Sequence, residues 1–455
     1  MPHIIVVGGG ITGLSAAWEL QQRGISYSLL EAASHWGGKI ISVELDVDGK
    51  SALADGGPDT LVTRKPEAWE LAAELGILDQ IENPGSETKN IYVLDGGIPV
   101  EIPLSPFKFI TSPLLSGRGK LRLLLEPFQP PRRDSGDESL AEFVARRLGR
   151  EALDKFIGPV LGGIYNTDPE TQSILVSSPI MREMEAESGG LFVAALQRAF
   201  RKPESTSKNK PEARFISFKG GVAGLVEALK EKLTGDLRLN TPVKKIESHG
   251  AGYKVTLQSG ESLHGDGVIV CTLASVAGEL VQSVAPEAGQ KLREIGHKNI
   301  GTVSLVYRET DIPAEPVING LMIPRREKRA IDAITVSSRK MPWRVPEGFA
   351  LLRIFIGGAR PEVVNMPDKA LLETVSDELR ALLGIKAAPQ THAIFRWPGG
   401  FPQAEVGHLE RIDQIETLLP PGIALAGSSY RGIAVPDCIR QGRAAAEKIL
   451  AQEIL

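Results

Sequence analysis

The chain opens with an apolar run, a glycine-rich turn and a stretch with helical periodicity. Residues 4–7 read IIVV, which is typical of a buried parallel strand. Leu14 to Gln22 predicts a helix, and Gly24 lies where a helix commonly ends. Residues 26–31, SYSLLE, predict a second strand. The pattern therefore predicts a strand, a turn, a helix and a strand in close succession.

Other parts of the chain show different patterns. Residues 91–104 alternate around a DGG turn, which predicts a hairpin. Residues 105–200 predict mostly helices, one of which begins with a capping box from Ser139 to Glu142. Residues 237–272 predict a β-meander. The end of the chain repeats the strand, glycine turn and helix of its start.

Composition and charge exclude several classes of function. The net charge is −4 and the pI is about 6.1, which gives no reason to expect nucleic acid as a partner. The two cysteines lie far apart and no histidines have the spacing of metal ligands, so neither a disulfide framework nor a metal is expected. No apolar run of about eighteen residues is present to span a bilayer. The first strand leaves no room for a signal or transit peptide, so we expect a cytoplasmic protein.

The first turn carries the fingerprint of a dinucleotide site. Gly8, Gly10 and Gly13 form GxGxxG between the first strand and the helix. The first glycine permits the tight turn, the second lets a pyrophosphate approach the backbone, and the third lets the helix pack on the strand. Glu31, at the end of the second strand, suits ribose hydroxyls and repels a 2′-phosphate, which disfavours NADP. The motif leaves FAD and NAD open, and an ordinary packing turn is the alternative.

The stretch EAASHWGGKI, residues 31–40, favours FAD. Gly37 and Gly38 let the backbone approach a cofactor, and the ammonium of Lys39 can neutralise phosphate or assist a flavin. FAD enzymes similar to the amine oxidases carry such an extension, often as ExxxRxGG[KR]. His35 stands where that pattern has arginine, and an ordinary loop is the alternative interpretation.

A stretch rich in leucine and phenylalanine covers residues 103–128. It also contains Lys108, Arg118, Lys120 and Arg122. This composition suits a helix on a membrane surface, with basic groups near anionic lipid. A helical domain that buries these leucines explains the composition equally well.

Seven further stretches carry a family resemblance. They are GGPDT (56–60), RGKLRLLLEPF (118–128), ESLAEFVARRLG (138–149), GPVLGGIYNTDPE (158–170), FKGGVAGLVEAL (218–229), RWPGGFPQAEVGHLERI (396–412) and YRGIAVPDCI (430–439). Together with GGGITGL at the start, they resemble the bacterial oxygen-dependent protoporphyrinogen and coproporphyrinogen oxidases of heme biosynthesis. The match runs nearly end to end.

The resemblance implies an FAD-dependent oxidoreductase that converts a porphyrinogen to a porphyrin. Six hydrogens leave the macrocycle, so a two-electron flavin needs three cycles, and O2 is reduced to H2O2. Protoporphyrinogen IX is favoured, because a membrane patch suits the less polar ligand, and coproporphyrinogen III is the alternative. A flavin amine oxidase or carotenoid desaturase, and a non-catalytic binding protein on the same fold, are further alternatives. The candidate partners are a membrane surface, with the protein peripheral on the inner face of the cell membrane, and the next enzyme of the heme pathway.

The resemblance also implies which residues bind FAD. The N-terminal turn would hold the pyrophosphate, Val243 would hold the adenine through its backbone, and the C-terminal turn would reach the flavin. The contacts carried over residue by residue are Gly8, Gly9, Gly10, Ile11, Thr12, Gly13, Leu14, Glu31, Ala32, Gly38, Lys39, Gly57, Pro58, Asp59, Thr60, Val243, Trp397, Ile433, Ala434 and Val435. The helix from Pro436 would point its positive end at the flavin, which stabilises the reduced form.

The expected substrate site needs cations for carboxylates and an apolar wall. No residue is expected to act as a nucleophile, because the chemistry belongs to the flavin. Arg64 and Lys65 follow the GGPDT stretch, and Lys65 falls where bacterial relatives have a substrate-channel lysine. Lys89 lies where some relatives have a substrate-contacting arginine, and Ile164 and Tyr165 would line the mouth of the pocket. A solvated basic pair and ordinary core residues are the alternatives.

We therefore predict an α/β fold, α+β overall. It combines a two-dinucleotide-binding FAD domain, with a parallel sheet and a β-meander, a mixed substrate domain and a mostly helical inserted domain. The predicted boundaries are 1–80, 214–275 and 396–455 for the discontinuous FAD-binding domain, 81–104 and 276–395 for the substrate-binding domain, 105–200 for the helical, membrane-associating domain and 201–213 for a mobile linker.

Overall fold

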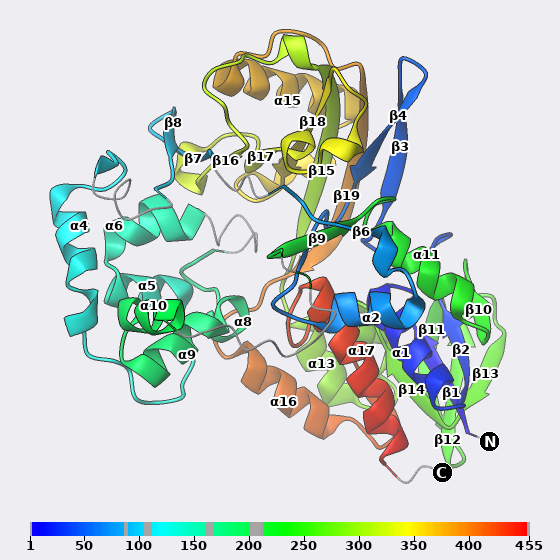
Figure 1. The fold of residues 1–455 in the computed structure, drawn as a ribbon. Helices are drawn as coiled ribbons and strands as arrows, with labels where there is room; N and C mark the ends of the chain where they lie inside the picture. The colour runs from blue at the N-terminus through cyan, green and yellow to red at the C-terminus, as the bar shows by residue number, and fades with distance from the viewer. Residues whose placement is uncertain are drawn as a thin grey trace.

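Two large sheets and a separate group of helices make up the fold, which is given by a computed structural model (Figure 1). The structure describes residues 2–85, 90–103, 111–159, 168–200, 211 and 213–452, with the side chains of 198–200 excepted. The predicted linker therefore lies almost wholly outside the described residues. Within these ranges, no helix combines the length and the apolarity that crossing a bilayer requires.

A parallel sheet at the lower right of Figure 1 is built from distant parts of the chain. Ile4 and Val6 pack into the core on one face, whereas Ile5 and Val7 pack into the core on the other. The buried first strand and the α/β fold class are thus confirmed. The sheet has the order β10 (Asp236–Arg238), β2 (Ser26–Leu30), β1 (His3–Val7), β14 (Gly267–Val270), β20 (Ile423–Leu425), and neighbouring strands are parallel.

Helices cover one face of this sheet, and a meander with further helices covers the other. The first face carries α1 (Ile11–Gln22), α2 (Glu67–Leu75), α11 (Ala223–Lys232) and α17 (Val435–Leu450). The second carries the predicted meander of β11 (Val243–His249), β12 (Gly252–Leu257) and β13 (Ser262–Gly265), with α12 (Ala274–Leu280), α13 (Pro286–Arg293) and α16 (His408–Leu418). Two separate apolar cores therefore enclose the sheet.

The second large sheet is mixed and lies at the top of Figure 1. Its order is β19 (Thr391–Pro402), β15 (His297–Arg308), β18 (Phe349–Ile356), β17 (Ala333–Val336), β16 (Gly320–Met322), β7 (Ile91–Asp95), β8 (Ile98–Glu101). The predicted hairpin is β7 and β8, and α15 (Asp368–Leu383) packs on the sheet. Shorter elements around both sheets are β3 (Ser42–Val47), β4 (Lys50–Asp55), β5 (Leu61–Val62), η1 (Leu78–Gln80), β6 (Ile81–Glu82), β9 (Phe215–Phe218), η4 (Glu309–Asp311), η5 (Arg325–Glu327), α14 (Ser337–Lys340), η6 (Pro342–Arg344) and η7 (Pro361–Asn365).

The helical group lies at the left of Figure 1 and has its own core. The predicted capping box is present, because Ser139 Oγ accepts from Glu142 N at 3.0 Å and Glu142 Oε2 accepts from Ser139 N at 2.9 Å. The elements are α4 (Gly117–Leu124), η2 (Glu126–Phe128), α5 (Leu140–Arg147), α6 (Arg150–Ala152), η3 (Leu153–Ile157), α8 (Ile174–Ser177), α9 (Pro179–Ser188) and α10 (Leu191–Phe200).

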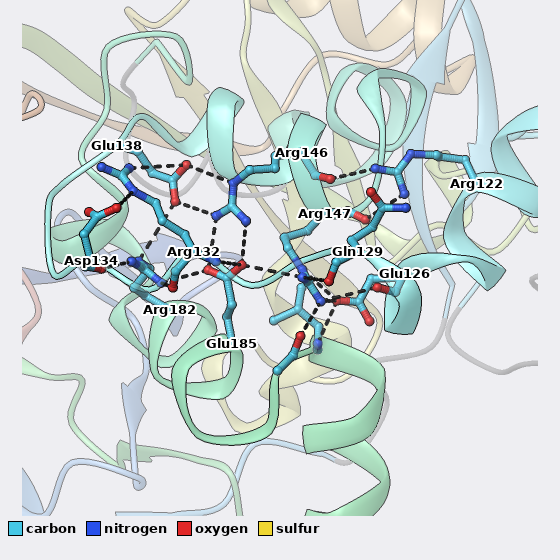
Figure 2. Close-up of polar contacts among 12 residues, drawn as sticks. Arg122, Glu126, Gln129, Arg132, Asp134, Glu138, Arg146, Arg147, Arg182 and Glu185 are labelled. Carbon is cyan, nitrogen blue, oxygen red and sulfur yellow. Dashed lines mark hydrogen bonds and ion pairs between the residues drawn. The ribbon is translucent and has the colours of Figure 1, made fainter.

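A buried ion pair ties the helical group together (Figure 2). Arg147 and Glu126 are both fully buried, and Arg147 Nε donates to Glu126 Oε1 at 2.8 Å. The same carboxylate accepts from the backbone N–H groups of Leu191 at 2.8 Å and Phe192 at 3.1 Å, at the start of α10. An anion at a helix N-terminus is favourable. Glu126 therefore fixes η2, α5 and α10 relative to one another.

Candidate functional site

The N-terminal turn has the geometry that GxGxxG predicts. A Cβ at Gly13 would lie 1.9 Å from the carbonyl oxygen of Gly8, and Gly8 itself has φ +107°. A Cβ at Gly10, by contrast, would meet nothing within 4 Å. Gly10 is the N-cap of α1 and makes no side-chain cap, so the first N–H groups of the helix have no capping side chain from this residue. The turn is therefore a cradle suited to an anionic group such as a pyrophosphate.

The helices that follow the two glycine turns are in contact. A Cβ at Gly442 in α17 would lie 2.2 Å from the carbonyl oxygen of Thr12, so α1 and α17 cross in close backbone contact. Ala434 is the N-cap of α17 and makes no side-chain cap, and Ile433 and Val435 flank it. Because the crossing lies within two turns of both helix starts, the two uncapped N-termini lie on the same side of the sheet.

Glu31 holds the first turn in place. Its Oε2 accepts from Gly9 N at 2.5 Å, and its Oε1 accepts from Ala33 N at 2.7 Å. The backbone carbonyl of Glu31 accepts from Thr241 N at 2.8 Å, two residues before Val243. The turn expected to hold the pyrophosphate is thus brought together with Glu31 and the segment of Val243, which are expected to hold the adenosine part of FAD. The neighbouring Ala32 is exposed.

The second glycine pair packs directly against the first turn. Gly37 N donates to Gly9 O at 2.8 Å, and a Cβ at Gly38, where φ is +60°, would lie 3.4 Å from Gly10 Cα. The GGPDT loop in turn packs against the backbone at Lys39, because a Cβ at Gly57 would lie 1.9 Å from the carbonyl oxygen of Lys39. Such close backbone approaches require glycine and explain why these positions carry it.

Lys39 reaches from this turn toward β19 and the C-terminal turn. Its ammonium donates to the carbonyl of Gly400 and lies 3.5 Å from Ser428 Oγ. Both acceptors are neutral, and burial lowers the pKa of the Lys39 ammonium. A buried cation next to neutral oxygens is suited to an anionic ligand.

Aromatic rings border the GGPDT loop on the side of β19. A Cβ at Gly56 would lie 2.5 Å from the ring of Phe395, which is stacked on Trp397 with centroids 6.4 Å apart. Pro58 and Thr60 are partly buried in the same loop. The predicted contact Trp397 thus lies beside the loop that contains four other predicted contacts.

The predicted substrate residues have different surroundings. Arg64 is exposed. Lys65 Nζ lies 2.6 and 2.5 Å from the two carboxylate oxygens of Asp437, a buried residue in the first turn of α17. Its charge is therefore partly balanced by an acid at the expected flavin end, and its role toward substrate stays a prediction. Lys89, Ile164 and Tyr165 lie outside the described residues.

Several residues of the site carried no signal in the sequence. Trp36 covers the first turn, because a Cβ at Gly9 would lie 2.4 Å from its ring. Asp437, Ser428 and Arg353 also contact the predicted segments, and each contact joins residues hundreds of positions apart. Among these residues, only Asp437 has a signal in the sequence, because it lies in the first turn of a predicted helix, where acids are favoured.

This geometry defines a class of protein. Two uncapped helix N-termini, their glycine turns and a buried cation are brought together by these contacts, an arrangement suited to a nucleotide cofactor. Residues 11–450 match the family model described as flavin containing amine oxidoreductase, and the chain belongs to that family. It is therefore an oxidoreductase whose cofactor is FAD.

Within this family the chain groups with the porphyrinogen oxidases, as the sequence resemblance predicted. It is 31% identical to the coproporphyrinogen III oxidase of Staphylococcus aureus (strain NCTC 8325 / PS 47), over 99% of each chain. It is 30% identical to the coproporphyrinogen III oxidase of Propionibacterium freudenreichii subsp. freudenreichii, over 98% of this chain and 90% of that one. A crystal structure from Exiguobacterium sp. 255-15, provisionally assigned as a protoporphyrinogen oxidase, matches with a TM-score of 0.85, at 27% identity and over 99% of each chain.

Proposed function

We propose that the chain binds FAD across its two glycine turns and uses it to oxidise a porphyrinogen to a porphyrin. The crossing of Gly442 on Thr12 carries the proposal, because it joins the first and last predicted FAD segments. The open turn at Gly10 would hold the pyrophosphate. The segments around Glu31 and Val243 would hold the adenosine.

The flavin end would lie among the GGPDT loop, Trp397 and the start of α17. FAD, when bound, accepts two electrons at a time and passes them to O2, so a six-electron oxidation takes three cycles. The protein orients the reactants and sets the local charge. Lys39 supplies a buried positive charge beside the loop, and Lys65 offsets the carboxylate of Asp437 at the helix start.

The purified protein provides the test. We expect a yellow protein with a flavin absorption spectrum that consumes O2 and forms a fluorescent porphyrin from a porphyrinogen. A colourless protein that takes up no FAD, or a flavoprotein that oxidises amines but neither porphyrinogen, would overturn the proposal.

Two porphyrinogens are candidate substrates. The sequence analysis favours protoporphyrinogen IX, with two propionates. Coproporphyrinogen III, with four propionates, is the second candidate, because the two relatives at 30% and 31% identity are coproporphyrinogen III oxidases. The ratio of kcat/KM for the two substrates under the same conditions decides between them.

If exposed Arg64 binds a propionate, Arg64→Gln should raise KM for the four-carboxylate substrate more than for the two-carboxylate substrate.

We further propose that the protein works in the cytoplasm, peripheral on the inner face of the cell membrane. The contact of helix α10 with η2 supports this proposal, because it places further exposed apolar side chains next to the predicted stretch. Leu124 and Phe128 are 65% and 80% exposed, and Arg118 is exposed on the same helix as Leu124. Apolar side chains with a cation beside them suit anionic lipid. This apolar patch consists of Leu121, Leu124, Leu125, Phe128, Phe192 and Leu196.

Vesicle sedimentation tests the membrane proposal. Leu124→Ser with Phe128→Ser should weaken binding to anionic vesicles, whereas Ile98→Ser, at a residue 66% exposed on β8, should not. Equal sedimentation of the double variant and the parent would contradict the membrane proposal.

The next enzyme of the pathway is the other proposed partner. If that enzyme rather than lipid binds the patch, the same variant would lose the protein complex and keep its vesicle binding.

A further inference from the structure

The GGPDT loop is held by cations from strand β18 and from the segment between β17 and β18. Asp55, at the end of β4 and the start of the loop, lies 2.8 Å from Arg344 Nη2. Both side chains are buried, with 6% and 1% of their surface exposed. Asp55 Oδ1 also accepts from Ser42 Oγ at 2.5 Å and from Val222 N at 3.2 Å. The residue directly before the loop is therefore fixed from both sides.

Arg353 on β18 forms hydrogen bonds with the middle of the loop. One guanidinium nitrogen, Nη2, donates to the carbonyls of both Gly56, at 2.9 Å, and Gly57. The other, Nη1, lies 3.6 Å from Asp59 Oδ2. The guanidinium also lies over the ring of Phe355, 4.8 Å from its centroid. Because the guanidinium is a rigid plane and only 5% of the residue is exposed, these contacts specify the path of the backbone.

Lys340 at the end of α14 holds the far end of the loop. Its ammonium donates to Thr60 Oγ1 at 2.8 Å and lies 3.4 Å from Asp59 Oδ1. It also lies 5.8 Å from the ring centroid of Phe215. Burial opposes ionisation of Asp59, but Lys340 and Arg353 outweigh it and hold the pKa of the Asp59 carboxyl well below its usual range. Asp59 thus stays ionised between the two cations.

From these contacts we infer that Arg353 and Lys340 are positioning residues for the cofactor. They lie in the substrate half of the fold, yet they set the conformation of the loop at residues 56–60, which the proposed function assigns to FAD. The inference rests on that proposed function. The consequence is that the sheet that would contact the substrate also determines how tightly the flavin is held. Flavin retention therefore depends on residues outside the nucleotide-binding motifs.

Arg353→Met in the full-length protein as purified is the test. We expect at least about a tenfold rise in the FAD dissociation constant, because the carbonyls of Gly56 and Gly57 and the carboxylate of Asp59 each lose one donor. The visible circular dichroism of the remaining bound flavin should also change. Arg353→Lys keeps the positive charge but loses the planar guanidinium with its two donor nitrogens, here called the fork. This variant should therefore behave like Arg353→Met. Full rescue by lysine would overturn the role of the fork.

Arg308→Met is the matched control. Arg308 also lies over a phenylalanine ring of β18, Phe349, at 5.4 Å, and pairs at 2.8 Å with Asp48 beside β3, but it is half exposed and distant from the loop. It should keep the parental FAD affinity and spectrum. A parental affinity and spectrum in Arg353→Met, or equal losses in Arg353→Met and Arg308→Met, would overturn the inference.

A second variant keeps the test decisive if Arg353→Met does not fold. The side chain of Lys340 is 31% exposed, so Lys340→Met should still fold, with the parental far-ultraviolet circular dichroism spectrum. It should nevertheless release FAD at a lower temperature, as recovered flavin fluorescence reports. Release at the parental temperature would overturn the inference. A parent protein that binds no flavin would instead overturn the proposed function.

Discussion

At the scale of single residues, Gly10 is the proposed cofactor contact at which shape alone would control binding. A Cβ there meets nothing within 4 Å, so the protein itself tolerates a side chain. We expect Gly10→Val to fold with a nearly unchanged melting temperature in the absence of FAD. Its affinity for FAD should fall by about 100-fold or more, close to 2.7 kcal/mol, because the side chain takes the place of the pyrophosphate.

Fluorescence titration of FAD-free protein measures this loss. Gly117→Val is the control, since Gly117 also starts a helix and has open space around its Cβ. Stoichiometric flavin in Gly10→Val would show that the open space serves another purpose.

Lys39 gives a prediction that depends on pH. Burial lowers the pKa of Lys39 in the folded chain below the usual 10.5. At a pH between the lowered pKa and 10.5, the unfolded chain therefore binds more protons than the folded chain. The stability of the FAD-free protein therefore rises with pH across that window, and the charged Lys39 is destabilising at neutral pH. We expect Lys39→Met to raise the melting temperature without FAD at about pH 7, with a gain that shrinks toward about pH 10, and to weaken FAD binding.

Thermal melts of parent and variant at both pH values test this expectation. Lys230→Met is the control, because Lys230 is exposed and pairs with Glu227 on the surface. A gain that does not change with pH would mean that the charge of Lys39 is not the cause.

At the scale of elements, the buried pair in Figure 2 makes the helical group rigid. Glu126→Gln removes one charge and leaves Arg147 buried beside a neutral amide. We expect a loss of about 3 kcal/mol in the stability of the helical group. The exposed pair of Arg150 and Glu170, 2.6 Å apart, is the control, and Glu170→Gln should cost less than about 1 kcal/mol. Equal effects of the two substitutions in urea unfolding would contradict the prediction.

The elements themselves were largely predictable from the sequence. The first strand, the hairpin, the meander and the capping box at Ser139 depend on local periodicity and turn chemistry, which neighbouring residues encode. The open turn at Gly10 follows from the same local rules. The pairing of Lys65 with Asp437 joins residues 372 positions apart, and no local pattern specifies such a contact. The long-range contacts that hold the site residues in place were for this reason not predictable.

At the scale of the whole molecule, the helical group has a core separate from those of the two sheets. Backbone bonds such as Ser173 N to Ala404 O, 2.9 Å, and Val406 N to Thr171 O, 3.0 Å, join it to the rest. We expect two calorimetric transitions, with flavin release following the one that contains the parallel sheet. Glu126→Gln should lower only the other transition. A single transition that shifts as a unit would contradict this prediction.

The crossing of α1 and α17 also bears on how the protein is made. The outer strand β20 and the helix that closes on Thr12 come from the last stretch of the chain, whereas α1 leaves the ribosome early and β14, the partner of β20, near the middle of synthesis. The turn proposed to hold the pyrophosphate must therefore wait through most of translation for the helix proposed to face the flavin. Nascent chains that stall before residue 423 should carry no flavin, and the supply of FAD should matter only after synthesis is complete.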